Sequence, residues 1–586
     1  MNKIPAYKRL LPFTDWLFHY KRENLTGDIL AGVIVTIMLI PQSLAYAMLA
    51  GLPPEYGLYA SIVPLFIYGL LGTSRTLSVG PVAVISLLTA TALTPFAAPG
   101  SEEYIKLAML LAAMTGVIQL VLGLIRGGFI ASLLSHPVVA GFITGSSLLI
   151  LVSQLKHILG VKAASGHLPY EAVTNLVQAA RDTNLVTLGM GTLAIALLLF
   201  FRKPFRKLLQ RIGLSENVAQ IIARTGPALL VVAGMAAVAL FSVDSSYGVK
   251  VVGEFPTGLP GLTLPSLDLP VIGSLAPAAL AIVLAGYVES VSVGRSLGAK
   301  RRQTIEPNQE LVALGAANVA SGFTGGFPVT GGFSRSVVNF DAGANTGLAS
   351  MITAVLIAVV TLSLAPLLKS LPQVVLAATV IVAVAGLINF KELLRLWKYS
   401  KGDGALMGLT ILSVLGLGVE IGIGVGVGAS LLLYLARAGR PHMAVLGRVG
   451  DSEHFRNIKR HEVTTYPGLL LLRVDENLFF ANTRNIEDRL LEYVAEQADL
   501  KHIVLSFNSV NYVDSSGLES LEALIVRLRD AGVTLHLAEV KGPVMDRFDK
   551  VGLTEHLAPG QVFLSTHRAV VALRGDSKPA EPARAA

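Results

Sequence analysis

Long apolar runs separated by short polar stretches are the feature that most constrains this sequence. Hydrophobic residues make up 53% of the 586 residues, and charged residues make up only 15%. A run of about 20 apolar residues crosses the hydrocarbon core of a bilayer as a helix. Lipid offers the backbone no hydrogen-bond partners, so the polar groups of each crossing segment must pair within the protein. The sequence therefore predicts a polytopic α-helical membrane protein.

Charged segments between the apolar runs predict the orientation of the chain. Basic residues gather at 202–211 and 391–401, whereas residues 97–103 contain Glu102 and Glu103 but no Lys or Arg. Because Lys and Arg favour the cytoplasmic side, both termini are expected in the cytoplasm, and the location expected is the cytoplasmic membrane of a bacterium. Fourteen spans are predicted, at 28–48, 55–71, 80–96, 104–125, 130–153, 184–201, 225–242, 271–293, 307–321, 333–340, 347–367, 372–388, 404–418 and 421–437.

One of these spans is interrupted. Residues 321–338 read Ser-Gly-Phe-Thr-Gly-Gly-Phe-Pro-Val-Thr-Gly-Gly-Phe-Ser-Arg-Ser-Val-Val. Each Gly costs a helix about 1 kcal/mol and each Pro about 3 kcal/mol, which disfavours a continuous helix. The pattern predicts extended backbone over 327–332 and a half-helix that begins at Phe333 within the membrane. A loop at the membrane surface is the alternative.

A second interrupted span has the same pattern. Residues 73–89 contain a polar turn, then Gly80 and Pro81, then a short apolar helix, and Pro81 suits the first turn of that helix. An ordinary helix that starts at a proline after a loop is the alternative. The two interrupted spans are each third in a half of seven, which suggests a seven-plus-seven inverted repeat. Paired broken spans are a pointer to the binding site of a transporter.

The two half-helices are predicted to run in opposite directions, with their N-termini facing each other near the midplane. A helix N-terminus exposes unpaired N–H groups and roughly half a positive charge, and it therefore attracts anions. Arg335 adds a charge there. Gln42 and Tyr46 lie four residues apart on one face of the first span and add hydrogen-bond donors. The alternatives are a bond from Gln42 to a neighbouring helix and interfacial anchoring by Tyr46.

Glu289 lies at the end of an apolar run in the eighth span. An ionisable group within a span is costly and marks an ion or proton pathway, so Glu289 is predicted to carry protons. A structural carboxyl group bonded to a neighbouring helix is the alternative. Glu420 is expected in an external turn between the last two spans. Gly422 with Gly426, and Gly424 with Gly428, form two small-xxx-small pairs in the last span that allow close helix packing.

After Arg440 the composition changes to that of a small α/β domain. Residues 514–517, Asp-Ser-Ser-Gly, fall at the start of a helix, where Asp or Ser caps well. A helix start also favours a phosphate on serine, so capping alone and phosphoregulation are both open. The predicted strands are 468–474, 502–507 and 533–538, and the predicted helices are 482–497, 516–531 and 543–552.

The composition also argues against several function classes. The chain has no cysteine, which excludes disulfides, thiol catalysis and cysteine-based metal sites. No nucleophile–base pair or metal-ligand cluster is visible, so the protein is not expected to be an enzyme or to hold a metal or cofactor. The net charge of +8 comes from short basic segments between spans, so no nucleic-acid partner is expected.

The sequence resembles the SulP family of anion transporters, which includes the sulfate permeases. The C-terminal domain resembles the STAS domain of that family, with Asp-Ser-Ser-Gly in its characteristic position. The resemblance implies a seven-plus-seven inverted repeat with core and gate domains, elevator-type alternating access and a homodimer. The matching motifs are Ile-Pro-Gln-Ser-Leu-Ala-Tyr-Ala at 40–47, Gly-Thr-Ser-Arg at 72–75, Ser-Val-Gly-Pro at 78–81, Asn-Gln-Glu-Leu at 308–311 and Thr-Gly-Gly-Phe-Ser-Arg-Ser at 330–336.

The resemblance also implies roles for particular residues. Residues 288–296 resemble the eighth-span motif of proton-coupled sulfate carriers, in which the glutamate that matches Glu289 is implicated in coupling. Ser516 matches a serine that is phosphorylated in soluble relatives, and it is a candidate regulatory phosphosite. The anion is expected between the third and tenth half-helices and the first span, at Gln42, Tyr46, Pro81, Val82, Ala83, Phe333, Ser334 and Arg335.

Together these observations predict secondary uptake of a small inorganic oxyanion, sulfate first, in symport with protons. The alternatives are a C4-dicarboxylate or bicarbonate carrier, an uncoupled anion exchanger, or a membrane-anchored STAS regulatory or sensor protein. A cytoplasmic regulatory protein is an expected partner of the STAS domain. The predicted domains are a cytoplasmic N-terminal segment 1–27, a transport domain 28–437, a STAS domain 438–575 and a disordered tail 576–586.

Overall fold

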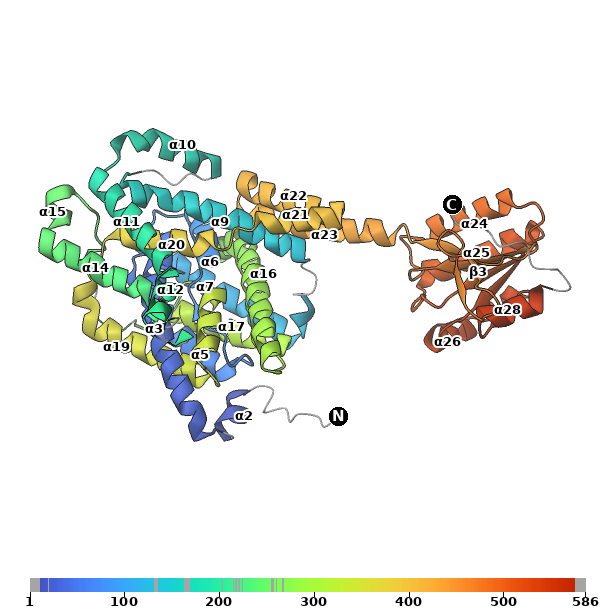
Figure 1. Cartoon of the computed structure of the whole chain (residues 1–586), viewed down its shortest axis with the longest axis horizontal. Coiled ribbons are helices and arrows are strands. Elements are labelled where there is room, and N and C mark those ends of the chain that lie inside the picture. The colour runs from blue at the N-terminus through green and yellow to red at the C-terminus, as the bar shows by residue number, and fades with distance from the viewer. Residues whose placement is uncertain are drawn as a thin grey trace. The chain divides into compact units, whose positions relative to one another are not determined.

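The computed structural model describes residues 11–574, except His19 and the stretches 131–134, 163–168, 203, 214, 217–218, 220–221, 224, 254–257, 260 and 266–267. The predicted tail 576–586 lies outside the described residues. The chain divides into two units, Met1–Ser430 and Leu431–Ala586 (Figure 1). We call them the membrane unit and the C-terminal unit.

Every one of the fourteen predicted apolar stretches contains a helix. In chain order these helices are α3 (Arg22–Leu49), α4 (Glu55–Tyr59) with α5 (Val63–Leu71), α6 (Ala83–Leu93), α7 (Glu102–Leu124), α9 (His136–Leu159), α11 (Leu185–Arg202), α14 (Gly226–Phe241), α16 (Leu269–Lys300), α17 (Pro307–Phe323), α18 (Phe333–Asp341), α19 (Leu348–Leu368), α20 (Gln373–Ala385), α22 (Lys401–Leu417) and α23 (Val419–Ala438). Further helices before and between them are α2 (Phe13–Phe18), α10 (Pro169–Ala179), α12 (Pro204–Arg211), α15 (Val243–Tyr247) and α21 (Phe390–Tyr399).

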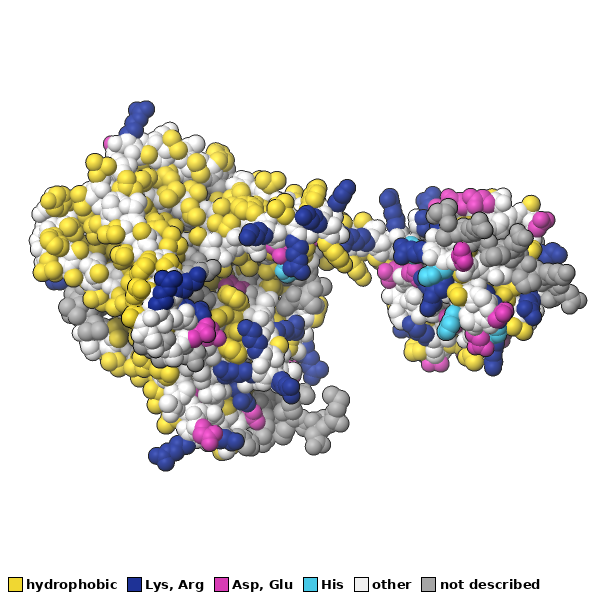
Figure 2. Space-filling view, in the orientation of Figure 1, with side chains coloured by type: hydrophobic (Ala, Val, Ile, Leu, Met, Phe, Trp, Pro, Cys, Tyr) yellow, Lys and Arg dark blue, Asp and Glu magenta, His cyan; other side chains and the backbone are white. Residues whose placement is uncertain are grey.

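The membrane unit has the surface of a protein that is embedded in lipid. Figure 2 shows hydrophobic side chains spread over it, whereas charged side chains crowd the surface of the C-terminal unit. Among the described residues, six helices are long and apolar enough to cross a membrane, and α10 with α11, bent by 118° at their junction, form a further candidate. Several helices, such as α6, are shorter. The count of fourteen spans and the inverted repeat therefore stay predictions.

Most helices of the membrane unit can be sorted into two groups, which we name after the predicted core and gate domains. In the core group, α3–α7 and α16–α19, α17 packs against α7 and α5, and α19 packs against α3 and α5. In the gate group, α9, α11, α14, α20, α22 and α23, α9 packs against α20 and α22. Glycines allow close approach: a Cβ added to Gly57 would lie 1.9 Å from the carbonyl oxygen of Ser43. Small residues of this kind are typical of helix interfaces in membranes.

Glycines also allow α23 to pack closely against α22, at one of the two predicted pairs; a Cβ added to Gly424 or Gly428 would meet nothing within 4 Å. A Cβ added to Gly422 would lie 2.5 Å from Val414, and one added to Gly426 would lie 2.8 Å from Thr410. The turn between the two helices is Gly418, whose φ of +93° reverses the chain in one residue. Glu420 therefore lies in the first turn of α23, and the expectation that it occupies an external turn is wrong.

The C-terminal unit is built on a six-stranded sheet of order β4–β3–β5–β6–β7–β8. The strands β5 to β8 are parallel, and β3 is antiparallel to β4 and β5. The three predicted strands and three predicted helices are confirmed, whereas β3, β4 and β8 were not predicted. The elements are β3 (Met443–Arg448), β4 (Phe455–Asn457), β5 (Leu469–Val474), α24 (Thr483–Glu496), β6 (His502–Ser506), α25 (Ser515–Asp530), β7 (Thr534–Ala538), α26 (Gly542–Lys550), α27 (Leu553–Leu557), β8 (Val562–Phe563) and α28 (Thr566–Leu573).

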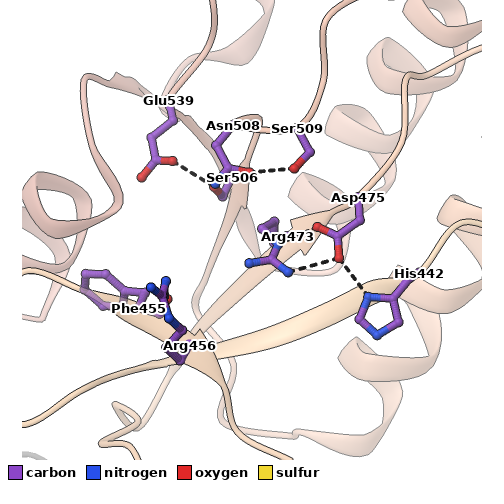
Figure 3. Close-up of polar contacts among 9 residues, drawn as sticks. All are labelled: His442, Phe455, Arg456, Arg473, Asp475, Ser506, Asn508, Ser509 and Glu539. Atoms are coloured by element: carbon purple, nitrogen blue, oxygen red, sulfur yellow. Dashed lines mark hydrogen bonds and ion pairs between the residues drawn. The ribbon is translucent and has the colours of Figure 1, made fainter. Parts of the chain in front are cut away.

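A polar cluster connects the first strand of this unit to the end of β5 (Figure 3). The Nε of Arg473 donates to Asp475 at 2.5 Å, and the other carboxylate oxygen lies 2.7 Å from Nδ1 of His442. Burial alone would raise the pKa of Asp475, but hydrogen bonds from Arg473 and His442 hold it below its ordinary value. Because His442 directly precedes β3, the cluster fixes where the chain enters the sheet.

Two histidines form a pair across β6 and β7. His536 is 2% exposed, and its Nδ1 accepts a hydrogen bond from the backbone N–H of Gln561 at 3.1 Å. The single proton of the neutral ring therefore lies on Nε2, which donates to Nδ1 of His502 at 3.2 Å. Burial and the neighbouring His502 lower the pKa of His536 to about 4. The native pair is neutral at physiological pH.

Acid is expected to loosen this part of the sheet. Unfolded histidine has a pKa of 6.5, so below that pH the unfolded chain binds a proton that folded His536 does not. A stability contribution of roughly 3 kcal/mol is then lost as the pH falls from 6.5 toward 4. Hydrogen exchange of the full-length protein, corrected for intrinsic rates, should show β6 and β7 losing protection in acid. The variant His536→Gln should lack this extra pH dependence; the same dependence in the variant would contradict the assignment.

Candidate functional site

Two short strands pair in the interior of the membrane unit. β1 (Val79–Gly80) pairs antiparallel with β2 (Thr330–Gly331), and all four residues are buried. Helix α6 begins at Ala83 and α18 begins at Phe333, so one helix leaves each end of this two-stranded ribbon. The N-termini of the two helices face each other across the ribbon. The predicted extended backbone and the predicted pair of half-helices are confirmed.

Neither of these helix N-termini is capped by a side chain. The N-cap residues are Val82 and Gly332, both extended and neither with a side-chain hydrogen bond to the helix. Pro81 precedes the N-cap, so the prediction that it lies in the first turn of α6 is wrong: the backbone that follows β1 stays extended through Val82. Uncapped N–H groups and two positive helix ends at one place favour negative charge there.

Arg335 is buried beside both helix starts. Its side chain is 2% exposed, and Nη1 donates to the carbonyl oxygen of Pro81 at 2.5 Å. Its Nε and Nη2 have no hydrogen-bond partner. Glycines make room for the guanidinium: a Cβ added to Gly332 would lie 3.0 Å from Nη2, and one added to Gly80 would lie 3.5 Å away. A buried cation with unpaired donors is costly, so this group is the part of the site that most favours an anion.

Two further predicted residues surround Arg335. The carboxyl group of Glu289 on α16 lies close enough to Arg335 and to the backbone N–H of Phe333 to interact with both. Tyr46 on α3 is 8% exposed and interacts electrostatically with Arg335 and Glu289. Three separate helices therefore bring a phenol, a carboxyl group and a guanidinium together at the tip of α18.

The other predicted residues lie at the same helix ends. Phe333 is 50% exposed and Ser334 is also exposed, so the tip of α18 is accessible although the ribbon beside it is buried. Val82 is half-buried and Ala83 is buried at the tip of α6. Gln42 is half-buried on α3, one turn before Tyr46.

Side chains that were not predicted hold β2 in place. Asn318 of α17 accepts from the backbone N–H of Val329 at 2.8 Å and donates to the carbonyl of the same residue at 3.0 Å. Ser290, the neighbour of Glu289 on α16, accepts from the N–H of Gly331 at 2.9 Å. The signal for Asn318 was in the sequence, because an asparagine within an apolar span needs a partner there.

Glu310 at the start of α17 holds the loop that leads into β1. Its carboxylate accepts from the hydroxyl of Tyr68 at 2.7 Å, from the N–H and hydroxyl of Thr73 at 2.8 and 2.5 Å, and from the N–H of Ser74 at 3.1 Å. Hydrogen bonds to a charged group each contribute roughly 1.5–3 kcal/mol. Glu310 belongs to the motif at 308–311, but no role was predicted for it.

The far end of α18 is anchored as well. Asp28 of α3 is fully buried and accepts from the N–H of Asn345 at 2.6 Å and from the hydroxyl of Thr346 at 2.6 Å. Arg301 at the end of α16 donates to the carbonyl of Phe340 in α18 at 2.9 Å and to the carbonyl of Ala344 in the loop after it. The loop after α18 is therefore tied to two other helices of the core group.

Comparison with known proteins places this fold in a family. The Sulfate permease family profile matches residues 25–410, and the STAS domain profile matches residues 460–569. The chain belongs to the sulfate permease family. The resemblance seen in the motifs is confirmed over most of the chain, as is the C-terminal STAS domain.

Several relatives of this sulfate permease family member match it along most of its length. Sulfate transporter 4.1, chloroplastic, of Arabidopsis thaliana is 35% identical over 97% of this chain and 83% of its own. A probable sulfate transporter of Mycobacterium tuberculosis (strain ATCC 25618 / H37Rv) is 34% identical over 95% of this chain and 96% of its own.

Solved structures share the fold of this family member. The murine Solute Carrier 26 family member A9 anion transporter in the inward-facing state matches with a TM-score of 0.87 and 25% identity, over 98% of this chain and 95% of that chain. The transmembrane domain of the cyanobacterium bicarbonate transporter BicA has a TM-score of 0.58 and 22% identity, over 70% of this chain and 98% of that chain. The predicted membrane-transporter fold with a STAS domain is thereby confirmed.

The Asp-Ser-Ser-Gly sequence of the STAS domain begins α25. Asp514 is the N-cap, and its carboxylate accepts from the N–H of Gly517 at 2.7 Å and from the N–H of Phe480 at 3.0 Å. Ser515 is exposed and Ser516 is half-buried. The capping role belongs to Asp514, and phosphorylation of Ser516 stays a prediction.

Replacing Arg335 should weaken anion binding. In Arg335→Gln the two unpartnered guanidinium donors and their charge are lost, so we expect the affinity for sulfate to fall by about tenfold or more. Titration of the detergent-solubilised protein with sulfate measures this. Arg295→Gln is the matched control, because Arg295 is an exposed arginine of α16. Wild-type affinity in Arg335→Gln would remove the guanidinium from the site.

Proposed function

We propose that this protein takes up a small inorganic oxyanion, sulfate first, together with protons. The observation that carries the proposal is Arg335, buried between two uncapped helix N-termini with Nε and Nη2 unpartnered. Two helix ends and one guanidinium offer positive charge and donors from several directions, as a tetrahedral oxyanion requires. The relatives named as sulfate transporters support sulfate as the anion.

Glu289 supplies a way to couple the anion to a proton. Its carboxyl group faces Arg335 and the N–H of Phe333, the same groups that are proposed to bind the anion. When Glu289 is ionised, its charge offsets that of Arg335 and repels an anion at short range, where the low dielectric strengthens both effects. Protonation of Glu289 removes this competitor. Anion and proton then bind together and leave together, which is symport.

The helix grouping supports an elevator-type movement. The half-helices, Glu289 on α16 and Tyr46 on α3 all belong to the core group, whereas α9 and α23 of the gate group lie across a small cavity from Glu289. That cavity is lined mostly by apolar side chains, such as Phe142 and Ile423. The core group could move along this apolar interface and carry the whole site with it, because no hydrogen bond within the site would have to break.

The remaining parts of the proposal concern the setting of the protein. We place it in a bacterial cytoplasmic membrane with both termini in the cytoplasm, as the charge of its short loops predicts. We expect a homodimer. The start of α25, where Ser515 is exposed and Ser516 is half-buried, offers a surface for a cytoplasmic regulatory protein and for phosphorylation.

Removing the carboxyl group of Glu289 should uncouple transport from protons. In proteoliposomes, an inward proton gradient should accelerate uptake of labelled sulfate by the wild type. Glu289→Gln should lose this acceleration, because its side chain no longer exchanges a proton, but should retain sulfate counterflow, because the neutral amide mimics the protonated acid.

Glu102→Gln serves as the control, since Glu102 lies on the surface and pairs with Lys106 at 2.7 Å. If neither sulfate nor another anion moves in the wild type, the transport proposal fails. If Glu289→Gln still responds to the proton gradient as the wild type does, the coupling role of Glu289 is wrong.

A further inference from the structure

A large cavity opens at the end of the membrane unit that the charge pattern assigns to the outside. Its volume is about 430 Å³, and helices of both the core and the gate group line it. Pro99 of the acidic 97–103 loop lies in its wall, and so does Tyr104 of α7. We call it the outer cavity. Lys156 and His157 of α9 face it, as does Glu420 at the start of α23.

Glu420 is the acidic group of this cavity. The turn at Gly418 places it in the first turn of α23. Its Oε1 is buried and accepts no hydrogen bond. A carboxylate near a helix N-terminus is stabilised by the helix dipole. Stabilisation of α23 alone, however, explains neither the cavity beside Glu420 nor its unpartnered oxygen. An oxygen without a donor, beside a water-sized space, is placed to take up a proton.

Glu289 lies near the same helix, one turn further in. Glu289 and Ile423 line one small cavity together with Val84 and Phe142. Ile423 follows Glu420 by three residues on α23, which corresponds to a rise of about 4.5 Å along the helix. A displacement of the core group by about one turn toward the outer cavity would bring Glu289 from the level of Ile423 to that of Glu420.

We propose that Glu420 is the gate-side proton partner of Glu289, and that the two carboxyl groups share one proton when the site faces outward. This inference rests on the proposed proton-coupled function. Two carboxylates at short distance cannot both stay ionised. The outward-facing state therefore requires a proton, which Glu420 accepts from water in the outer cavity. The proton then passes to Glu289 and leaves with the core group; no other bond is made or broken.

Other charged and titratable groups face this pair. Lys156, His157 and Tyr104 line the outer cavity together with Glu420, and Tyr46 and Arg335 interact with Glu289. Lys156 places a basic side chain in the wall of the outer cavity. His157 is a second side chain of this cavity that can exchange a proton, so its own contribution must be separated by a variant.

The test is the dependence of sulfate uptake on external pH in proteoliposomes. In Glu420→Gln the external pH at half-maximal uptake should shift downward by about one unit, a tenfold change in proton concentration, while sulfate affinity in detergent stays at the wild-type value. Glu420→Asp keeps the carboxyl group and should keep the wild-type profile. His157→Gln should leave the profile in place, and Glu102→Gln is the surface control.

Each result bears on one of the two proposals. A wild-type pH profile in Glu420→Gln overturns the inference, and so does an equal shift in Glu420→Asp, because the position would then matter and the carboxyl group would not. A shifted profile in His157→Gln with a normal one in Glu420→Gln assigns the proton to the histidine and overturns it too. If Glu289→Gln remains coupled to protons, the proposed function fails whatever Glu420 does.

Discussion

The pairing of two buried strands of two residues each is the interaction on which the membrane unit depends. A backbone N–H or C=O without a partner in lipid costs several kcal/mol, and a chain that changes from extended to helical within the membrane unit creates several such groups. Val79 pairs with Gly331, and Gly80 pairs with Thr330. Each broken span thereby supplies hydrogen-bond partners for the extended backbone of the other. Neither half-helix could begin within the protein interior without this exchange, and the accessible helix ends exist only because of it.

The charge of Arg335 is the second constraint. A buried guanidinium with two unpartnered nitrogens favours any negative charge that reaches it, and the structure supplies a carboxyl group close by. An anion and an ionised Glu289 are then alternatives for one cation. By thermodynamic linkage, a proton that raises anion affinity by some factor must itself bind more tightly by the same factor when the anion is present. Coupling of this kind needs no gate between the two sites.

The sequence predicted the broken spans because glycine and proline act locally. The start of α18 at Phe333 follows from the last glycine before it, whereas α6 begins two residues beyond Pro81 because pairing with β2 extends the strand. The short strands β4 and β8 carry too few residues for any periodicity.

Contacts between helices could not be predicted from such local sequence patterns. Helical spacing along α16 does not reveal that α18 brings Arg335 near the carboxyl group of Glu289. Nor does it show that the chain reverses at Gly418 and that Glu420 consequently lines the outer cavity. Asn318 was visible as a polar residue in an apolar span, yet its partner Val329 depends on how α17 packs.

The bonds from Asp28 and Arg301 to the end of α18 and to the loop after it have a mechanical consequence. Together with the ribbon at its start, they clamp the short helix at both extremities. An anion that binds at the tip of α18 cannot shift this helix independently of its neighbours. Any displacement of α18 must therefore include α3 and α16. The bound anion and the core group should therefore move together. Without the hydrogen bonds of Asp28, binding would shift α18 alone instead of the whole group.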